Sequence, residues 1–202
     1  RPSGNKGPVA TRLRSFARYQ REEAWTWEHM ALSRARMISG DQSLIEEAER
    51  IIEEVLAAPR DQATTVKDVT EMRALIEKEK PPKDIWDLKL IPGGLIDIEF
   101  IAQYLALIAP GKGHRVRTNE LSTADALKAL GTLIDPNDLD TCLTALKLYT
   151  DLSQVIRLCI DGPFEPGNVP AGLTDRVARA AESPDLKTAE AEVKRLSKAV
   201  RK

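Results

Sequence analysis

The stretch Leu95–Ile108 constrains the fold more than any other part of the sequence. It is apolar apart from Asp97, Glu99 and Gln103. An apolar run of this length is too long for a typical strand and has the right length for a buried helix. The interruptions exclude a membrane span, which needs about 20 mostly apolar residues. We therefore expect a central buried helix and no membrane association.

Apolar residues recur at helical spacing through most of the remaining chain. Capping residues such as Asp41, Asp61 and Ser122 precede these segments, and prolines follow several of them. The spacing predicts helices near 23–36, 41–58, 61–80 and 136–160, with 41–80 folded as an antiparallel helical hairpin. Only a short segment near 86–92 is expected to be extended. The predicted fold class is all-α: an irregular helical bundle around a central buried helix.

The charge is balanced over the whole chain but not locally. Thirty Lys and Arg stand against 31 Asp and Glu, a net charge of −1 that argues against a nucleic-acid binder. Residues 1–36 carry a net charge of +5 and residues 41–80 a net charge of −5. The basic block could face a nucleotide phosphate or dock on the acidic helices that follow. The composition favours the second interpretation.

The cysteines and histidines do not suggest a catalytic or zinc site. Cys142 and Cys159 lie in one predicted helix, roughly 25 Å apart, which is too far for a disulfide. Reduced thiols are typical of a cytoplasmic protein. His29 and His114 have no companion ligands in the sequence, and His29 is expected to be a packed, hydrogen-bonded imidazole.

Asp97 and Glu99 could share a metal ion only on a strand, where alternate side chains lie on one face. On a helix the two carboxylates diverge by about 200°. Because the surrounding pattern is helical, we expect structural charges, paired with Arg34, Arg36 or Lys89. The sequence therefore predicts no metal site and no catalytic residue within this chain.

Several motifs occur in a fixed order along the chain. They are 1–11 (RPSGNKGPVAT), 19–20 (YQ), 23–29 (EAWTWEH), 34–36 (RAR), 87–89 (DLK) and 93–104 (GGLIDIEFIAQY). In this order they resemble the bacterial glutamine synthetase adenylyltransferase family. The resemblance runs from the first residue to the last, and the end of the chain resembles the end of the second, adenylylating half of those enzymes.

The resemblance implies an activity for the parent protein. Such enzymes transfer AMP from ATP to a tyrosine of glutamine synthetase, and a homologous N-terminal half removes it by phosphorolysis. The PII signal protein and glutamine regulate both directions. The transfer uses Mg²⁺ held by clustered aspartates, which in this family precede the Arg-Pro-Ser-Gly motif. The resemblance thus implies that this chain alone binds neither ATP nor Mg²⁺ and is inactive.

The resemblance also implies a division of the chain. Residues 1–38 are expected to be a remnant of the nucleotidyltransferase lobe, and 39–202 a C-terminal helical bundle domain. Independently of the resemblance, Trp25 and Trp27 lie about 200° apart around a helix, so one of them should be buried in the core and the other should contact a neighbouring element or domain. The side chains nearest the nucleotide would be Arg1, Ser3, Asn5 and Lys6. The expected interdomain or structural side chains are Trp25, Trp27, Glu28, Arg34, Arg36, Lys89, Asp97 and Glu99.

Two alternatives remain at this point. The chain could be a non-catalytic helical module that binds glutamine synthetase or PII, using the acidic helices 41–80 and the loop 109–121. It could also be part of a PII uridylyltransferase, although the motif at 25–29 and the absence of downstream regulatory domains count against that reading.

Overall fold

The computed structural model describes residues 10–114, 118–119 and 121–202. Within these ranges the chain forms nine α-helices and no strand, which confirms the all-α prediction. Two short 3₁₀ helices, η2 (Pro110–Lys112) and η3 (Gly131–Leu133), lie between them. The α-helices are α1 (Leu13–Glu22), α2 (Thr26–Leu32), α3 (Gln42–Ala57), α4 (Gln62–Glu79), α5 (Leu95–Ile108), α6 (Thr123–Ala129), α7 (Pro136–Cys159), α8 (Ala171–Ala180) and α9 (Leu186–Arg201).

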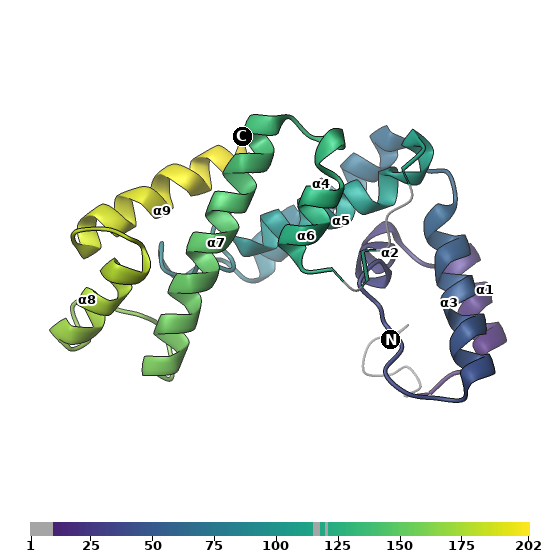
Figure 1. Ribbon diagram of the computed structural model, residues 1–202, viewed down its shortest axis with the longest axis horizontal. Coiled ribbons are helices and arrows are strands. Elements are labelled where there is room, and N and C mark those ends of the chain that lie inside the picture. The colour runs from purple at the N-terminus through teal and green to yellow at the C-terminus, as the bar shows by residue number, and fades with distance from the viewer. Residues whose placement is uncertain (1–9, 115–117, 120) are drawn as a thin grey trace.

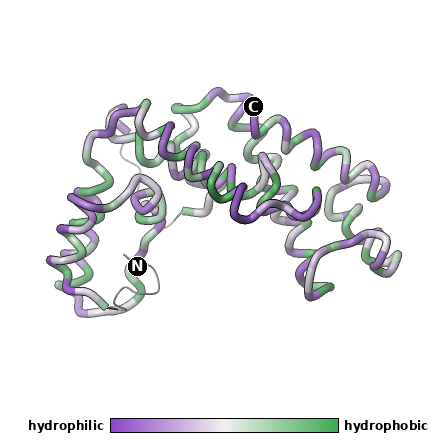
Figure 2. The backbone as a smooth tube through the Cα atoms, turned by 180° about the vertical axis from the view of Figure 1, so that it is seen from behind, coloured by the Kyte–Doolittle hydropathy of each residue, from purple (hydrophilic) through white to green (hydrophobic). Residues whose placement is uncertain are grey.

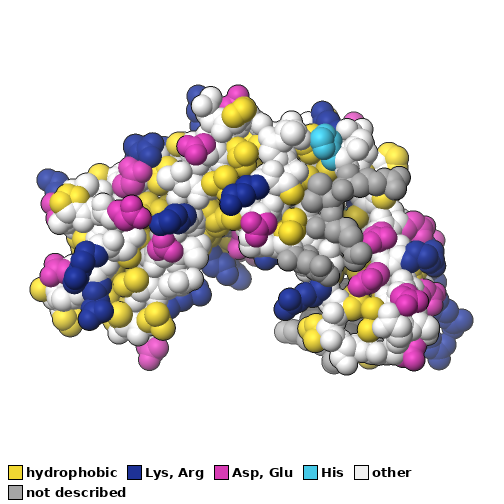
Figure 3. Space-filling view, in the orientation of Figure 1, with side chains coloured by type: hydrophobic (Ala, Val, Ile, Leu, Met, Phe, Trp, Pro, Cys, Tyr) yellow, Lys and Arg dark blue, Asp and Glu magenta, His cyan; other side chains and the backbone are white. Residues whose placement is uncertain are grey.

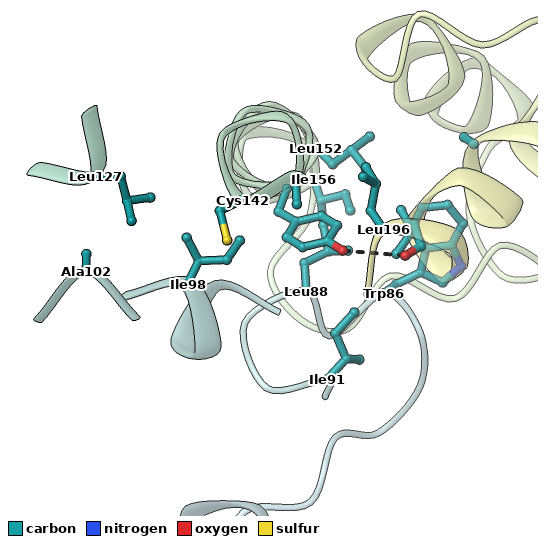
Figure 4. Close-up of a cluster of buried hydrophobic side chains, with 14 of the residues drawn as sticks. Trp86, Leu88, Ile91, Ile98, Ala102, Leu127, Cys142, Leu152, Ile156 and Leu196 are labelled. Carbon is teal, nitrogen blue, oxygen red and sulfur yellow. Dashed lines mark hydrogen bonds between the residues drawn. The ribbon is translucent and has the colours of Figure 1, made fainter. Parts of the chain in front are cut away.

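Helix α5 has the bounds that the sequence predicts and runs through the middle of the elongated molecule (Figure 1). It packs against α2, α4, α6, α7 and α9. Ile98, Ala102 and Leu105 on α5 are almost fully buried in the main hydrophobic cluster. Figure 4 shows Ile98 facing Cys142 of α7, with Leu152, Ile156 and Leu196 beyond it. The mostly apolar sequence of this helix is therefore explained by its packing against neighbours on several sides.

The C-terminal helices α7, α8 and α9 pack against one another and form the end of the molecule that lies on the left in Figure 1. Tyr149 of α7 and Val193 of α9 are fully buried there. The rings of Trp86 and Phe164 meet edge to face at a centroid distance of 5.2 Å, closing the cluster from the loop side. Hydrophilic and hydrophobic residues alternate along α9, as expected for an amphipathic outer helix (Figure 2).

Helices α1, α2 and α3 form the opposite end around a second hydrophobic cluster. Its buried members are Ala17, Leu32, Ile51, Ile52 and Val55. Arg21 of α1 makes two hydrogen bonds to the Glu54 carboxylate of α3, at 3.1 and 2.8 Å. At this position the basic block docks on an acidic helix, as the composition favours. The domain boundary after residue 38 stays a prediction, and the packing joins α3 to α1 and α2.

The predicted hairpin of 41–80 is wrong, although both of its helices form. Asp41 and Asp61 cap α3 and α4 by accepting bonds from Leu44 N and Thr64 N. Helix α3 packs mainly on α1 and α2, whereas α4 packs on α2 and α5. The short helix α2, which replaces the longer predicted helix over 23–36, lies against both of them.

Residues 86–92 form consecutive turns instead of the expected extended segment. The amides of Leu90 and Ile91 both donate to the carbonyl oxygen of Asp87, at 2.9 and 3.0 Å. Trp86, Leu88 and Ile91 are nonetheless buried in the main cluster (Figure 4). Burial of residues 86 and 88, with residue 87 less buried between them, is also typical of a strand. The turns place residue 91 in the same hydrophobic cluster.

The surface carries charges of both signs. Basic and acidic side chains are interspersed over the face seen in Figure 3. Within the described ranges, no helix combines the length and the apolar character that a membrane crossing requires. Cys142 and Cys159 are both free thiols on α7, as predicted, the first buried and the second exposed.

Candidate functional site

The motif at 23–29 lies beside a cleft of about 480 Å³ where four helix ends meet. The C-terminal ends of α1 and α3 and the N-terminal ends of α2 and α4 line this cleft. The amide and carbonyl groups at helix ends have no partners within the helix, so the side chains around the cleft supply their hydrogen bonds. The polar side chains of the lining include Arg21, Thr26, His29, Arg60 and Asp61.

Glu28 fastens the beginning of α2 to α1. Its carboxylate accepts a hydrogen bond from the Trp25 amide at 3.0 Å, which caps the helix. Both carboxylate oxygens lie 2.8 Å from the Tyr19 hydroxyl, which donates to them. This hydrogen bond is the main reason that the pKa of Tyr19 rises to about 12. Glu28 therefore acts as a structural anchor between α1 and α2.

His29 joins the same two helices to the connection between α3 and α4. Its Nε2 lies 2.9 Å from the carbonyl oxygen of Gln20, which can only accept, so Nε2 carries the proton. Its Nδ1 lies 3.2 Å from Nη2 of Arg60 and accepts from it. Burial lowers the pKa of His29, and the charge of Arg60 lowers it further. His29 is a packed, hydrogen-bonded imidazole, as the sequence predicts.

Arg60 is a residue of this cleft that the sequence analysis missed. Its guanidinium donates to the carbonyl oxygens of Val55, Leu56 and Ala58, at 3.1, 3.3 and 2.9 Å. A cation there neutralises the negative end of α3, while burial lowers the pKa of Arg60. The sequence did contain a signal for this role: Arg60 directly follows Pro59 at the predicted end of a helix, where a basic side chain interacts favourably with the carbonyl groups.

Both tryptophans of the motif are exposed, so the expectation that one of them is core is wrong. Trp25 is 70% exposed and Trp27 is 44% exposed. Between them Thr26 donates a hydrogen bond to Asp68 of α4, which fixes this part of the backbone. Met30 supplies the buried apolar face of α2 instead.

The motif at 93–104 builds a second charged network, inside the core. Oδ2 of Asp97 accepts hydrogen bonds from Nη2 and Nε of Arg73 at 2.8 and 3.0 Å, and Oδ1 accepts one from Nη1 of Arg201 at 2.6 Å. Glu77 pairs with both arginines, at 3.5 and 2.9 Å. Asp97 is a structural charge here, but its predicted partners were wrong. The network holds α4, α5 and α9 together.

Gly93 explains why this motif contains glycine. Its φ of +76° lies in the left-handed region that side chains disfavour. A Cβ at this position would lie 1.9 Å from the backbone oxygen of Ser197. Its amide also donates to Asp97 at 3.1 Å. Helix α9 therefore packs directly on the turn that precedes α5.

The other sequence-predicted residues are scattered. Arg34 donates to Thr123 at 3.4 Å across a small pocket that Glu99 also lines. Arg36 and Lys89 are exposed. Among the described residues, no group of three or more His, Cys, Asp or Glu side chains is placed to hold a metal ion. The candidate nucleotide-binding residues Arg1, Ser3, Asn5 and Lys6 lie outside the described residues.

The chain is similar to part of several known enzymes. The family model for GlnE, glutamate-ammonia ligase adenylyltransferase, matches residues 1–51. Along its whole length, the chain is 64% identical to a bifunctional glutamine synthetase adenylyltransferase/adenylyl-removing enzyme of Rhizobium meliloti. This chain resembles one segment of that enzyme. The enzymes with the same name from Agrobacterium fabrum and Mesorhizobium japonicum are 61% and 50% identical over the whole chain.

The similarity covers only part of each adenylyltransferase. The chain spans about a fifth of the length of the curated relatives it matches, 21% of the Rhizobium meliloti enzyme and 20% of the Agrobacterium fabrum enzyme. Both networks therefore lie in a segment that is similar from end to end to these adenylyltransferases.

Proposed function

We propose that this chain is the helical C-terminal part of the adenylylating half of a glutamine synthetase adenylyltransferase. The observation that carries the proposal is the 64% identity along the whole chain to an enzyme of that name. The relatives are named as adenylyltransferases, which favours this reading over a PII uridylyltransferase. The full enzyme would transfer AMP from ATP to a tyrosine of glutamine synthetase, under control by PII, in the cytoplasm.

The division of labour follows from what the described residues offer. Asp97 accepts hydrogen bonds from two arginines, and among the described residues no group of three or more His, Cys, Asp or Glu side chains is placed to hold a metal ion. We therefore assign the metal-binding acids to the nucleotidyltransferase lobe that the family places before residue 1. Bound Mg²⁺ would supply charge neutralisation on the triphosphate. Arg1, Ser3, Asn5 and Lys6 would contact the nucleotide.

This chain's own contribution would be to position that lobe. Glu28 and His29 connect α2 to α1 by hydrogen bonds, and Arg60 connects His29 to the C-terminal end of α3. Asp97 fixes α5 to α4 and α9 on the other side. Hydrogen bonds and ion pairs between helices limit the movement of the helices, and group transfer requires the reacting groups to be positioned accurately.

Calorimetry and a segment-replacement experiment test the proposal. We expect the chain alone to show no micromolar affinity for ATP with Mg²⁺ and no AMP transfer. In a chimera, this chain replaces the matching 203 residues of the Rhizobium meliloti enzyme. We expect that chimera to adenylylate glutamine synthetase at a rate within about tenfold of the parent. Transfer by the chain alone, or an inactive but folded chimera, would contradict the proposal.

A pull-down separates the interaction-module alternative. Glutamine synthetase and PII are each presented to the isolated chain and to the chimera. Capture only by the chimera fits a catalytic body that works together with its lobe. Strong capture by the isolated chain would favour a binding module instead.

A further inference from the structure

The two ring nitrogens of His29 face partners of opposite kinds. Nε2 donates to the carbonyl oxygen of Gln20 on α1 at 2.9 Å, and Nδ1 accepts from Nη2 of Arg60 at 3.2 Å. A carbonyl oxygen can only accept a hydrogen bond and a guanidinium can only donate one. The neutral imidazole with its proton on Nε2 is therefore the form that satisfies both neighbours at once.

Arg60 connects this ring to the C-terminal end of α3. Its guanidinium also donates to the carbonyl oxygens of Val55, Leu56 and Ala58. These carbonyl groups lie where partners within the helix run out. The position of one guanidinium thus couples the protonation state of His29 to the last turn of α3.

A proton added to Nδ1 changes one contact of the ring and leaves the other in place. Nδ1 and the Arg60 guanidinium would then be two positively charged donors that face each other at the present separation of 3.2 Å, and they would repel. Nε2 keeps its hydrogen, so its bond to the Gln20 carbonyl oxygen remains. Protonation therefore breaks only the contact with Arg60.

Three carboxylates near His29 could offset a positive ring, but each already accepts hydrogen bonds from other groups. Glu28 is bonded to α1 and to the beginning of its own helix, α2. Glu54 is bonded to an arginine of α1, and Asp61 caps α4. The charge added to the ring therefore meets the like charge of Arg60 at the shortest distance.

We infer that protonation of His29 releases Arg60 and opens the cleft of about 480 Å³ on the side of α3, while α1 and α2 stay joined. The opening stays local, because Arg21, another cation of the cleft, still binds Glu54 of α3. Thr26 likewise keeps α2 bonded to Asp68 of α4. The part that loosens is the end of α3 from residue 55 to residue 60.

Hydrogen–deuterium exchange measured by mass spectrometry tests this inference in the 202-residue chain. Exchange rates at pH 7.5 and pH 5 are divided by the intrinsic rates at each pH, so that only the protection of the amides is compared. Burial lowers the pKa of His29 below its ordinary value of 6.5, so the ring is neutral at the higher pH. At pH 5 we expect protection at 55–58 to fall about tenfold or more, with protection at 18–29 and in α7 unchanged.

Variants of the two partners assign the effect. Arg60→Gln should show at pH 7.5 the low protection at 55–58 that the unsubstituted chain shows at pH 5. His29→Gln should make protection at 55–58 independent of pH. Arg50→Gln is the matched control, because Arg50 is an exposed arginine on the same helix that pairs with Glu54 at 3.6 Å. It should leave the pH response in place.

Nuclear magnetic resonance of the unsubstituted chain provides a measurement that does not depend on any variant. Long-range proton–nitrogen spectra at pH 7.5 should show His29 protonated at Nε2 and unprotonated at Nδ1. A proton on Nδ1 at this pH would contradict the inference. So would equal protection of 55–58 at both pH values, an equal loss of protection along the whole chain, or a loss at 55–58 that persists in His29→Gln.

Discussion

Asp97 on α5 and Arg201 at the last turn of α9 form a hydrogen bond of 2.6 Å, although 104 residues separate them in the sequence. The other oxygen of the same carboxylate binds Arg73 of α4, which is only 4% exposed. One carboxylate therefore joins three helices, and it compensates a guanidinium that has little access to water.

Replacing Asp97 should destabilise the fold strongly. Asp97→Asn keeps the shape but removes the negative charge, which leaves the buried Arg73 with only its longer ion pair to Glu77, at 3.5 Å. Loss of one member of a buried ion pair costs about 3 kcal/mol or more, and urea unfolding measures the change. Glu190→Gln, which removes an i,i+4 pair with Lys194 on α9, is the control and should cost less than about 1 kcal/mol. Equal losses in the free energy of unfolding for the two variants would show that the buried network stabilises the fold no more than an exposed ion pair does.

Gly93→Ala should displace α9 from the turn before α5. The new Cβ would clash with the backbone of Ser197, and the φ of +76° is itself unfavourable for alanine. We expect a loss of more than about 2 kcal/mol in the free energy of unfolding. Gly111→Ala is the matched control, since a Cβ there meets no atom within 4 Å. A small effect at residue 93 would mean that α9 can move away without penalty.

The stability should fall as the pH falls below about 6.5, because of His29. Burial lowers the pKa of His29 below its ordinary value of 6.5. In that window the unfolded chain binds a proton that the folded chain does not, so acidification favours unfolding. Protonation at Nδ1 would also remove the acceptor for Arg60. Melting temperatures measured between pH 7.5 and pH 5 check this expectation.

A substitution assigns this pH dependence to one residue. His29→Gln should flatten the melting temperature between pH 7.5 and pH 5, whereas His114→Gln should leave the dependence in place. The carboxyl groups of Asp41, Glu54 and Asp61, whose pKa values hydrogen bonds lower, lose their stabilising effect only near and below about pH 4. An unchanged slope in His29→Gln would contradict the assignment.

The two cysteines should differ sharply in reactivity. Cys159 is exposed, whereas Cys142 is buried and burial raises the pKa of its thiol to about 11. Because the thiolate is the reactive form, a disulfide reagent at pH 8 should titrate one thiol in the folded chain and two in denaturant. Cys159→Ser should abolish the fast reaction. Two fast thiols in the folded chain would mean that α7 opens readily.

Local signals in the sequence were sufficient for the helices themselves. Helix α5 has its predicted bounds because a mostly apolar run and the preceding glycines both act within one segment. Pro136 begins α7 for the same kind of reason, since proline suits the first turn of a helix. The packed imidazole of His29 could also be predicted from its apolar neighbours.

The failed predictions share a different property. The hairpin of α3 and α4, the buried tryptophan and the partners of Asp97 all depend on which helices meet, and the periodicity of one helix does not contain that information. The prediction of an extended segment at 86–92 failed for a related reason. Burial of residues 86 and 88 with a less buried residue between them occurs both in a strand and in consecutive turns.

The sequence by itself determined the helical class, the caps, the central position of α5 and the resemblance to the adenylyltransferases. Spacing, capping and motif order are properties of neighbouring residues, so they can be read without coordinates. Only the tertiary structure decided that Asp97 pairs with Arg73 and Arg201, 24 and 104 residues away. It also decided that Trp25 and Trp27 face outward. The physical reason is that burial and ion pairing depend on the helix that arrives from elsewhere in the chain.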